Sequence, residues 1–270
     1  MRSALINFNR HVTLLGSYFT QYAKVRVSYR GDFFISAATS MAATIFSLGF
    51  VLVLFARIPR LANWRMEEVL FLYGFSLIPF GLFNVFSLNL YEFGATYIME
   101  GKFDRVLLRP LSSLFQVLFE TFRIESLQEV VVGLAVVVWA SHRLHYQWHI
   151  VDIVLLAVFA LCGGLIYISV FLFLSTFSFF FEDRIGIHPP FWNLLAFGRY
   201  PLSIYSGYIQ FLLSWIIPFG FATFYPATRL LGRPEFRIYA PLIPLVSLAT
   251  FALAATSWRL GLRRYSSTGS

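Results

Sequence analysis

The sequence predicts an all-α integral membrane protein with six transmembrane helices, from its composition, its long uncharged stretches and the positions of its basic residues. Of the 270 residues, 58% are hydrophobic and 13% are charged, whereas soluble globular chains carry roughly 25% charged residues. The mean hydropathy is +0.71. This composition excludes a disordered chain, and the single cysteine, Cys162, excludes a disulfide-rich secreted domain. A nucleic-acid partner is excluded as well, because the basic patch that binds one needs a water-facing surface.

Basic residues flank the apolar part of the chain on both sides. They precede the first long apolar stretch and follow the last one, at Arg2, Arg10, Lys24, Arg26, Arg30, Arg259, Arg263 and Arg264. Lys and Arg accumulate in the cytoplasmic segments of membrane proteins. We therefore expect cytoplasmic termini, an even number of crossings, and a cytoplasmic tail over residues 261–270.

Residues 1–30 carry apolar side chains at helical spacing. The apolar positions are Leu5, Phe8, Val12, Leu15, Phe19 and Tyr22, with basic residues between and after them. This pattern is typical of a helix that lies in the membrane interface instead of crossing it. We predict a cytoplasmic, interfacial amphipathic helix here.

Four uncharged stretches are long enough to cross about 30 Å of hydrocarbon as single helices. The uncharged stretches are residues 33–56, 69–91, 153–181 and 238–258, and the corresponding predicted spans are residues 33–56, 69–91, 152–181 and 238–260. A shorter stretch, residues 126–141, qualifies if Glu129 lies at its inner end and Trp139 marks its outer interface. The four long stretches are the predicted first, second, fourth and sixth spans. The shorter stretch, residues 126–141, is the predicted third span.

The region before the last span is rich in helix-breaking residues. Prolines occur at positions 189, 190, 201, 218 and 226, and glycines at positions 186, 198, 207 and 220. Because an even number of crossings is required, two neighbouring apolar segments here must together cross once. We predict a fifth span over residues 189–205 and an outer re-entrant hairpin over residues 206–225. The alternative, a crossing from Tyr208 to Phe224, stays open.

The centres of the predicted spans hold almost no ionisable side chains. Arg199 lies within the fifth span, and the acidic residues near the membrane lie at span ends, at Glu92, Glu129, Asp152 and Glu182. Ion-coupled carriers usually keep titrating residues at mid-membrane, so a secondary transporter is disfavoured. The chain also lacks a P-loop, because Gly101-Lys102 is followed by Phe103 in place of Ser or Thr. Energy for transport would have to come from another subunit.

Three of the five histidines are candidate metal ligands. His142, His145 and His149 follow one another at helical spacing in the predicted outer loop, and they could face a single metal ion. This leaves open an intramembrane metal-dependent enzyme as an alternative function. A non-transporting membrane scaffold is another. Our expectation is that the chain has no catalytic residue and binds no metal or cofactor.

The most distinctive stretch directly follows the second span, in the predicted cytoplasmic loop over residues 92–125. It reads Gly101-Lys102-Phe103-Asp104-Arg105-Val106-Leu107-Leu108-Arg109-Pro110-Leu111. This stretch resembles a signature found in one branch of the permease subunits of type-2 ATP-binding-cassette (ABC) exporters. A second likeness to that branch is Ile216-Ile217-Pro218-Phe219-Gly220-Phe221, followed by Tyr225-Pro226-Ala227. The resemblance covers essentially the whole chain.

The resemblance implies an ATPase that docks on the loop between the second and third spans. The coupling residues would be Gly101, Lys102, Phe103, Asp104, Arg105, Leu107, Leu108, Arg109 and Pro110. Phe103, Leu107 and Leu108 would supply apolar contacts to the partner, and Pro110 would end the helix. A second cytoplasmic contact would lie at Glu182, Asp183 and Arg184, and the outer re-entrant region would contain Pro218, Tyr225 and Pro226.

The function that the resemblance implies is half of the membrane pathway of an ABC exporter in the bacterial cytoplasmic (inner) membrane. The chain itself would not be an enzyme, since ATP and Mg would bind at the partner ATPase. A second permease chain, identical or related, would complete the dimer within the lipid. The sequence does not identify the substrate.

Overall fold

The computed structural model describes residues 16, 20, 30–181 and 187–266. Apart from three residues, the predicted amphipathic helix over residues 1–30 lies outside this part of the chain. The predicted contact at Glu182, Asp183 and Arg184 lies outside it too, as do the last four residues of the tail.

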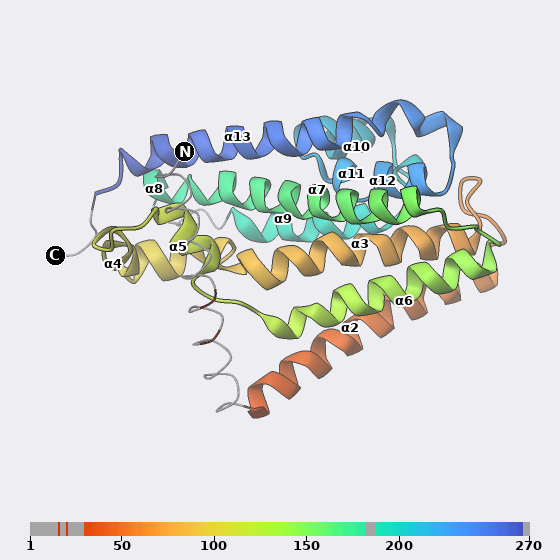
Figure 1. The fold of residues 1–270 in the computed structure, drawn as a ribbon, viewed down its shortest axis with the longest axis horizontal. Coiled ribbons are helices and arrows are strands. Elements are labelled where there is room, and N and C mark those ends of the chain that lie inside the picture. Colours follow the sequence, from red (N-terminus) through yellow and green to blue (C-terminus); the bar gives the residue numbers. More distant parts are fainter. Residues whose placement is uncertain (1–15, 17–19, 21–29, 182–186, 267–270) are drawn as a thin grey trace.

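Five long helices form the body of the protein (Figure 1). They are α2 (Arg30–Arg57), α3 (Met66–Ser87), α6 (Leu127–Arg143), α7 (Ile150–Ser175) and α13 (Leu242–Leu262). Each belongs to a helical segment that is long and apolar enough to cross a membrane, and the described residues contain no β-strand. The prediction of an all-α membrane protein is therefore confirmed.

Helix α3 is the centre of the bundle. In the span to which it belongs, 89% of the most apolar window is buried inside the protein, and α3 packs against both α6 and α7. Helix α2 is mostly exposed, because only 11% of the most apolar window in its span is buried inside the protein. Its exposed side chains include Phe34, Phe46 and Phe50. An apolar helix with so little protein contact must cover its surface with lipid or another chain.

Glycines allow the helices to approach one another closely. A Cβ atom on Gly133 of α6 would lie 2.6 Å from the carbonyl oxygen of Gly74 in α3. On Gly163 of α7 it would clash with the carbonyl oxygen of Ala222. Such contacts between backbones are a main source of helix association in lipid, where the hydrophobic effect does not act between helices.

Short helices join α3 to α6 at one end of the bundle, which we call the α4 end. They are η1 (Leu88–Leu90), the π-helix η2 (Phe93–Met99), α4 (Lys102–Leu107), α5 (Ser113–Phe119) and η3 (Ile124–Ser126). Helix α8 (Ser178–Phe181) lies at this end too, where α3, α7 and α13 finish (Figure 1).

The predicted fifth span differs from a regular helix. It consists of α9 (His188–Leu194), η4 (Leu195–Arg199) and η5 (Leu202–Ile204), none of which is long enough to cross a membrane alone. Pro189 and Pro190 fit the first turn of α9, where no intrahelical donor is needed. Pro201 lies between η4 and η5, where its ring interrupts the helical hydrogen bonding.

The predicted hairpin follows as a bent pair of helical arms. The first arm contains α10 (Gly207–Phe211) and the π-helix η6 (Leu212–Ile216), and the second contains α11 (Phe219–Ala222) and α12 (Phe224–Leu230). The arms, Gly207–Ile216 and Phe219–Leu230, meet at 71°, which fits a broken span or a re-entrant loop. Figure 1 places α10, α11 and α12 together towards the end of the bundle where α13 begins, which we call the hairpin end. The 3₁₀ helix η7 (Pro234–Tyr239) leads from there into α13.

Candidate functional site

Gly101 sets the direction of α4. It occupies the N-cap position with a φ of +69°, in the left-handed region that side chains with a Cβ disfavour. A Cβ atom at this position would meet no other atom within 4 Å. The glycine of the signature is therefore explained by backbone conformation and not by crowding.

Helix α4 has one face inside the protein and one outside. Phe103 is 0% exposed and Val106 is also buried, whereas Leu107 is exposed and Leu108 is 85% exposed. Pro110 follows the helix at the surface. Phe103 thus differs from its expected position as an apolar contact for a partner, because its ring is unavailable to another protein. Leu107 and Leu108 are accessible at the protein surface, and their contact with a partner stays a prediction.

Phe103 lies in a cluster of five aromatic rings that we call the aromatic seat. Its ring centroid lies 5.6 Å from that of Phe93, 5.4 Å from Phe179 and 5.0 Å from Tyr265. Trp258 of α13 completes the seat, 5.0 Å from both Phe93 and Phe179. The seat connects α4 to η2, α8 and the last turns of α13. Tilted and edge-to-face rings at these distances attract one another beyond their area burial.

Polar contacts fasten α4 in the same position. The hydroxyl of Tyr265 donates a hydrogen bond of 2.9 Å to Oδ1 of Asp104. Burial, together with this carboxylate, raises the pKa of Tyr265 to about 12. On the other side, the fully buried Gln116 of α5 donates from Nε2 to the carbonyl oxygens of Val106 at 3.0 Å and Leu111 at 3.2 Å. Asp104, expected to contact a partner, is therefore engaged within the chain.

The remaining signature residues form a basic surface around α4. Lys102, Arg105 and Arg109 are exposed. Lys102 Nζ pairs with Glu100 at 2.9 Å, and Arg109 approaches Glu120 at 3.9 Å. Exposed pairs of this kind contribute roughly 0–1 kcal/mol. These cations are thus weakly held and available to a partner.

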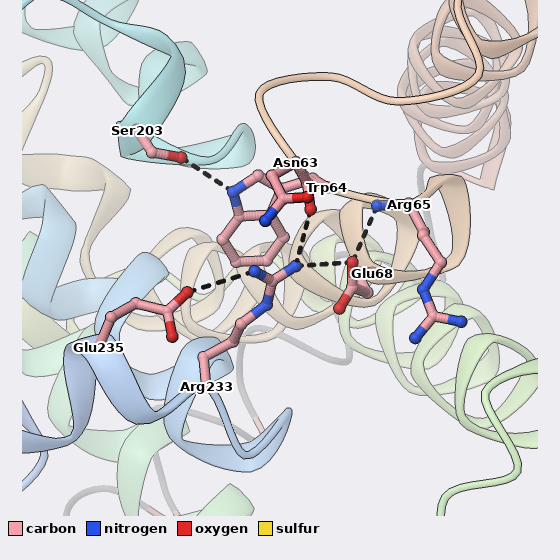
Figure 2. A network of polar contacts seen from close by, with 7 residues as sticks. All are labelled: Asn63, Trp64, Arg65, Glu68, Ser203, Arg233 and Glu235. Atoms are coloured by element: carbon pink, nitrogen blue, oxygen red, sulfur yellow. Dashed lines mark hydrogen bonds and ion pairs between the residues drawn. The ribbon is translucent and has the colours of Figure 1, made fainter.

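A second polar cluster, which sequence reasoning missed, lies at the hairpin end (Figure 2). Arg233 Nη2 donates to Oε2 of Glu68 at 2.8 Å and to the carbonyl oxygen of Asn63 at 3.2 Å, and Nη1 donates to Glu235 at 3.3 Å. The same Oε2 accepts the backbone N–H of Arg65 at 2.8 Å. Arg233 follows α12, so it ties the end of the hairpin to the start of α3.

Trp64 joins a third segment to this cluster. Its ring is buried beneath Arg233, whose guanidinium carbon lies 4.2 Å from the ring centroid. Its Nε1 donates to the Ser203 hydroxyl in η5 at 2.8 Å. The signal that could have identified this cluster is the opposite charge of Glu68 and Arg233, each beside a predicted span. Their separation of 165 residues hid the pairing.

The predicted outer residues lie inside the hairpin. Pro218 lies between the two arms. The Tyr225 hydroxyl hydrogen-bonds the Ser214 hydroxyl at 2.8 Å, and its ring stacks on Tyr239 at 4.2 Å. Pro226 is buried in α12. These contacts bind the two arms together and attach them to η7.

The structure does not gather His142, His145 and His149, which were predicted to lie in an outer loop, into one cluster. His142 and His145 line a cavity of about 370 Å³ with Trp139 and Arg143, and His149 instead approaches Asp152 at 3.4 Å. Within the described ranges there is no group of three or more His, Cys, Asp or Glu side chains that could hold a metal ion. The geometry therefore gives no support to the metal-dependent enzyme.

The comparisons with known proteins agree with this architecture. The sequence matches the family described as "ABC-2 family transporter protein" over residues 40–269, which includes most of α2 and all the later helices. No curated protein and no solved structure matches the chain. The match covers well over half of the sequence, so this chain is a member of the ABC-2 transporter family and a multi-pass membrane permease of an ABC transporter.

Proposed function

We propose that the chain is the permease subunit of an ATP-driven exporter, with a separate ATPase seated on the α4 end. The observation that supports this most is the two-sided construction of α4. Leu107 and Leu108 project from a helix whose other face is anchored by Phe103. Exposed leucines on a firmly held short helix are suited to a groove of a moving partner.

The basic side chains around these leucines add electrostatic complementarity. Lys102, Arg105 and Arg109 surround the apolar tip, and each is exposed. A partner groove with acidic residues at its rim would be steered to this surface and held in one register. The chain supplies no P-loop of its own, so ATP and Mg bind at the partner.

Motion of the partner would enter the membrane through the aromatic seat. A displacement of α4 must move Phe103, which is in contact with Phe179 and lies edge-on to Trp258 of α13. Packed interiors respond to such displacements as rigid units. The last span would therefore move with the ATPase, together with the short helices at the α4 end.

The proposed orientation places the α4 end in the cytoplasm and the hairpin end outside, in a bacterial cytoplasmic membrane. The basic residues before α2 and at the end of α13 would then lie on the inner side, as the positive-inside rule requires. A second permease chain, identical or related, would complete the pathway. Export would release the cargo past the hairpin.

The test is a double substitution at the tip of α4. Leu107→Ser with Leu108→Ser should abolish association with the ABC ATPase that co-purifies with the unaltered chain, while the thermal stability of the permease stays unchanged. The control is Ile150→Ser with Val151→Ser, since these residues are also apolar and exposed but lie at the start of α7. The control should keep the ATPase.

Two results would contradict the proposal. One is full ATPase retention by the α4 variant. The other is an unaltered chain that purifies with no ATPase and transports nothing when one is added, which would favour the non-transporting scaffold.

A further inference from the structure

Arg199 is a half-buried cation packed against α3. It ends η4, within the broken fifth crossing. The guanidinium carbon lies 5.3 Å from the ring centroid of Phe80 and 5.9 Å from that of Tyr73, both in α3. None of the carboxylates in the described ranges lies within ion-pair distance of it. Aromatic faces hold this charge in place of a counter-ion.

The carboxylate that acts on Arg199 electrostatically is already engaged. Glu129 accepts hydrogen bonds from Asn84 at 2.9 Å and from Ser40 at 3.3 Å, and it interacts with Arg199 only through space. The five N–H donors of a guanidinium need acceptors when water is excluded. An intramembrane cation without a bonded partner marks a candidate binding site.

A tyrosine with an unpaired hydroxyl lies beside Arg199. Tyr73 is 0% exposed, and its hydroxyl has no hydrogen-bond partner among the described residues. Its ring is one of the two that flank the Arg199 guanidinium. Buried polar groups are nearly always paired, so an unpaired one indicates a missing partner. An arginine with a hydroxyl nearby is a donor set that suits an anion, and a guanidinium binds phosphate or carboxylate in a two-pronged fashion.

The position of Arg199 relates this donor set to the hairpin. The neighbouring Gly198 accepts a hydrogen bond of 2.7 Å from the Thr223 hydroxyl, so Arg199 directly adjoins the contact between η4 and the hairpin. We infer that Arg199 and Tyr73 bind the anionic group, a phosphate or a carboxylate, of an amphipathic cargo whose apolar body lies against Phe80 and its neighbours. This inference rests on the proposed transport function.

The experiment adds three amphiphiles of equal chain length to the purified chain in dodecyl maltoside. The probes are dodecyl phosphate, dodecyl maltoside in excess, and dodecyltrimethylammonium, with inorganic phosphate as a fourth arm. Thermal unfolding reports binding, because a ligand that binds only the folded state raises the midpoint. We expect dodecyl phosphate alone among the amphiphiles to raise it. A shift with inorganic phosphate as well would assign the anion itself as the recognised group.

Variants identify the site. Arg199→Gln should weaken dodecyl phosphate binding by about tenfold or more, the range of charge-assisted hydrogen bonds, and Tyr73→Phe by about threefold to tenfold. The matched control is Arg143→Gln, because Arg143 also lies over an aromatic ring, Trp139 at 5.5 Å, but is exposed at the end of α6. It should bind the probe as the unaltered chain does.

An independent readout needs no ligand. Removing a half-buried charge that has no ion-pair partner relieves its desolvation, so Arg199→Gln should melt at a higher temperature than the unaltered chain without any probe. If Arg199→Gln still binds dodecyl phosphate as the unaltered chain does, Arg199 is not part of the site. If Arg143→Gln loses as much binding as Arg199→Gln, the assignment to Arg199 is contradicted too. Neither outcome affects ATPase association, which tests the transport function separately.

Discussion

Phe103 and Leu108 are five residues apart in one signature but have opposite environments, and substitution should separate their roles. Phe103→Ala removes a fully buried ring from the aromatic seat, so we expect a loss of about 3–5 kcal/mol of stability. Leu108→Ala alters an exposed side chain and should change stability by less than about 0.5 kcal/mol. Thermal unfolding of both variants in detergent is the measurement. Equal melting temperatures would show that α4 is not anchored by Phe103.

Arg233 offers a comparison of two ion pairs on one guanidinium. Glu68, with 11% of its side chain exposed, lies at 2.8 Å, whereas Glu235, with 48% exposed, lies at 3.3 Å. Glu68→Gln should therefore cost about 1–3 kcal/mol, and Glu235→Gln roughly 0–1 kcal/mol. A double-mutant cycle with Arg233→Gln measures each coupling. Coupling that is stronger to Glu235 would contradict the arrangement in Figure 2.

The raised pKa of Tyr265 predicts that stability at the α4 end depends on pH. Burial and Asp104 raise its pKa from 10.0 to about 12. A raised pKa means that the folded state favours the neutral phenol, so this stabilisation is complete below pH 10 and disappears as the pH rises towards 12. The difference in absorbance at 295 nm between the unaltered chain and Tyr265→Phe should titrate near the upper value. Asp104→Asn should lower that midpoint, and an unchanged midpoint would exclude the hydrogen bond.

At the scale of elements, α13 and α8 pack so closely that adding one methyl group, by a glycine-to-alanine substitution, should disturb their contact. A Cβ atom on Gly261 would lie 2.6 Å from Cδ2 of Phe179, whereas on Gly49 of α2 it would meet nothing within 4 Å. Gly261→Ala should therefore lower the melting temperature by displacing the aromatic seat. Gly49→Ala should leave it unchanged or raise it, since alanine favours helix by about 1 kcal/mol over glycine. Thermal unfolding of both variants is the measurement. A lower melting temperature for Gly49→Ala but not for Gly261→Ala would contradict the close contact between α13 and α8.

The long helices could be predicted because twenty or so apolar residues between charged flanks have few alternatives. Pro189, Pro190 and Pro201 indicated a broken fifth span, but the sequence did not determine where the pieces end. The interior position of Phe103 could not be predicted either. A helix of six residues carries too little periodicity to show which face is buried, and three of the four rings packed around Phe103 lie 76 or more residues away, at Phe179, Trp258 and Tyr265.

At the scale of the whole molecule, the two ends are built for different tasks. The α4 end presents an exposed apolar tip on an aromatic base, and the hairpin end is tied by Arg233 and Trp64 to α3 and η5 (Figures 1 and 2). Between them, α2 exposes most of its apolar surface. This division fits the proposed function, in which the permease would receive force at the α4 end and open at the hairpin end.

Site-specific cross-linking tests that division most directly. In a Cys162→Ser background, which removes the only native cysteine, Leu108→Cys places a thiol on the α4 tip and Ile150→Cys places one at the start of α7. Both native side chains are similarly exposed, at 85% and 82%. We predict that a short bifunctional reagent joins the ATPase to Leu108→Cys and not to Ile150→Cys. Cross-linking at Ile150→Cys alone, or at neither position in a complex that hydrolyses ATP, would contradict docking on the α4 end.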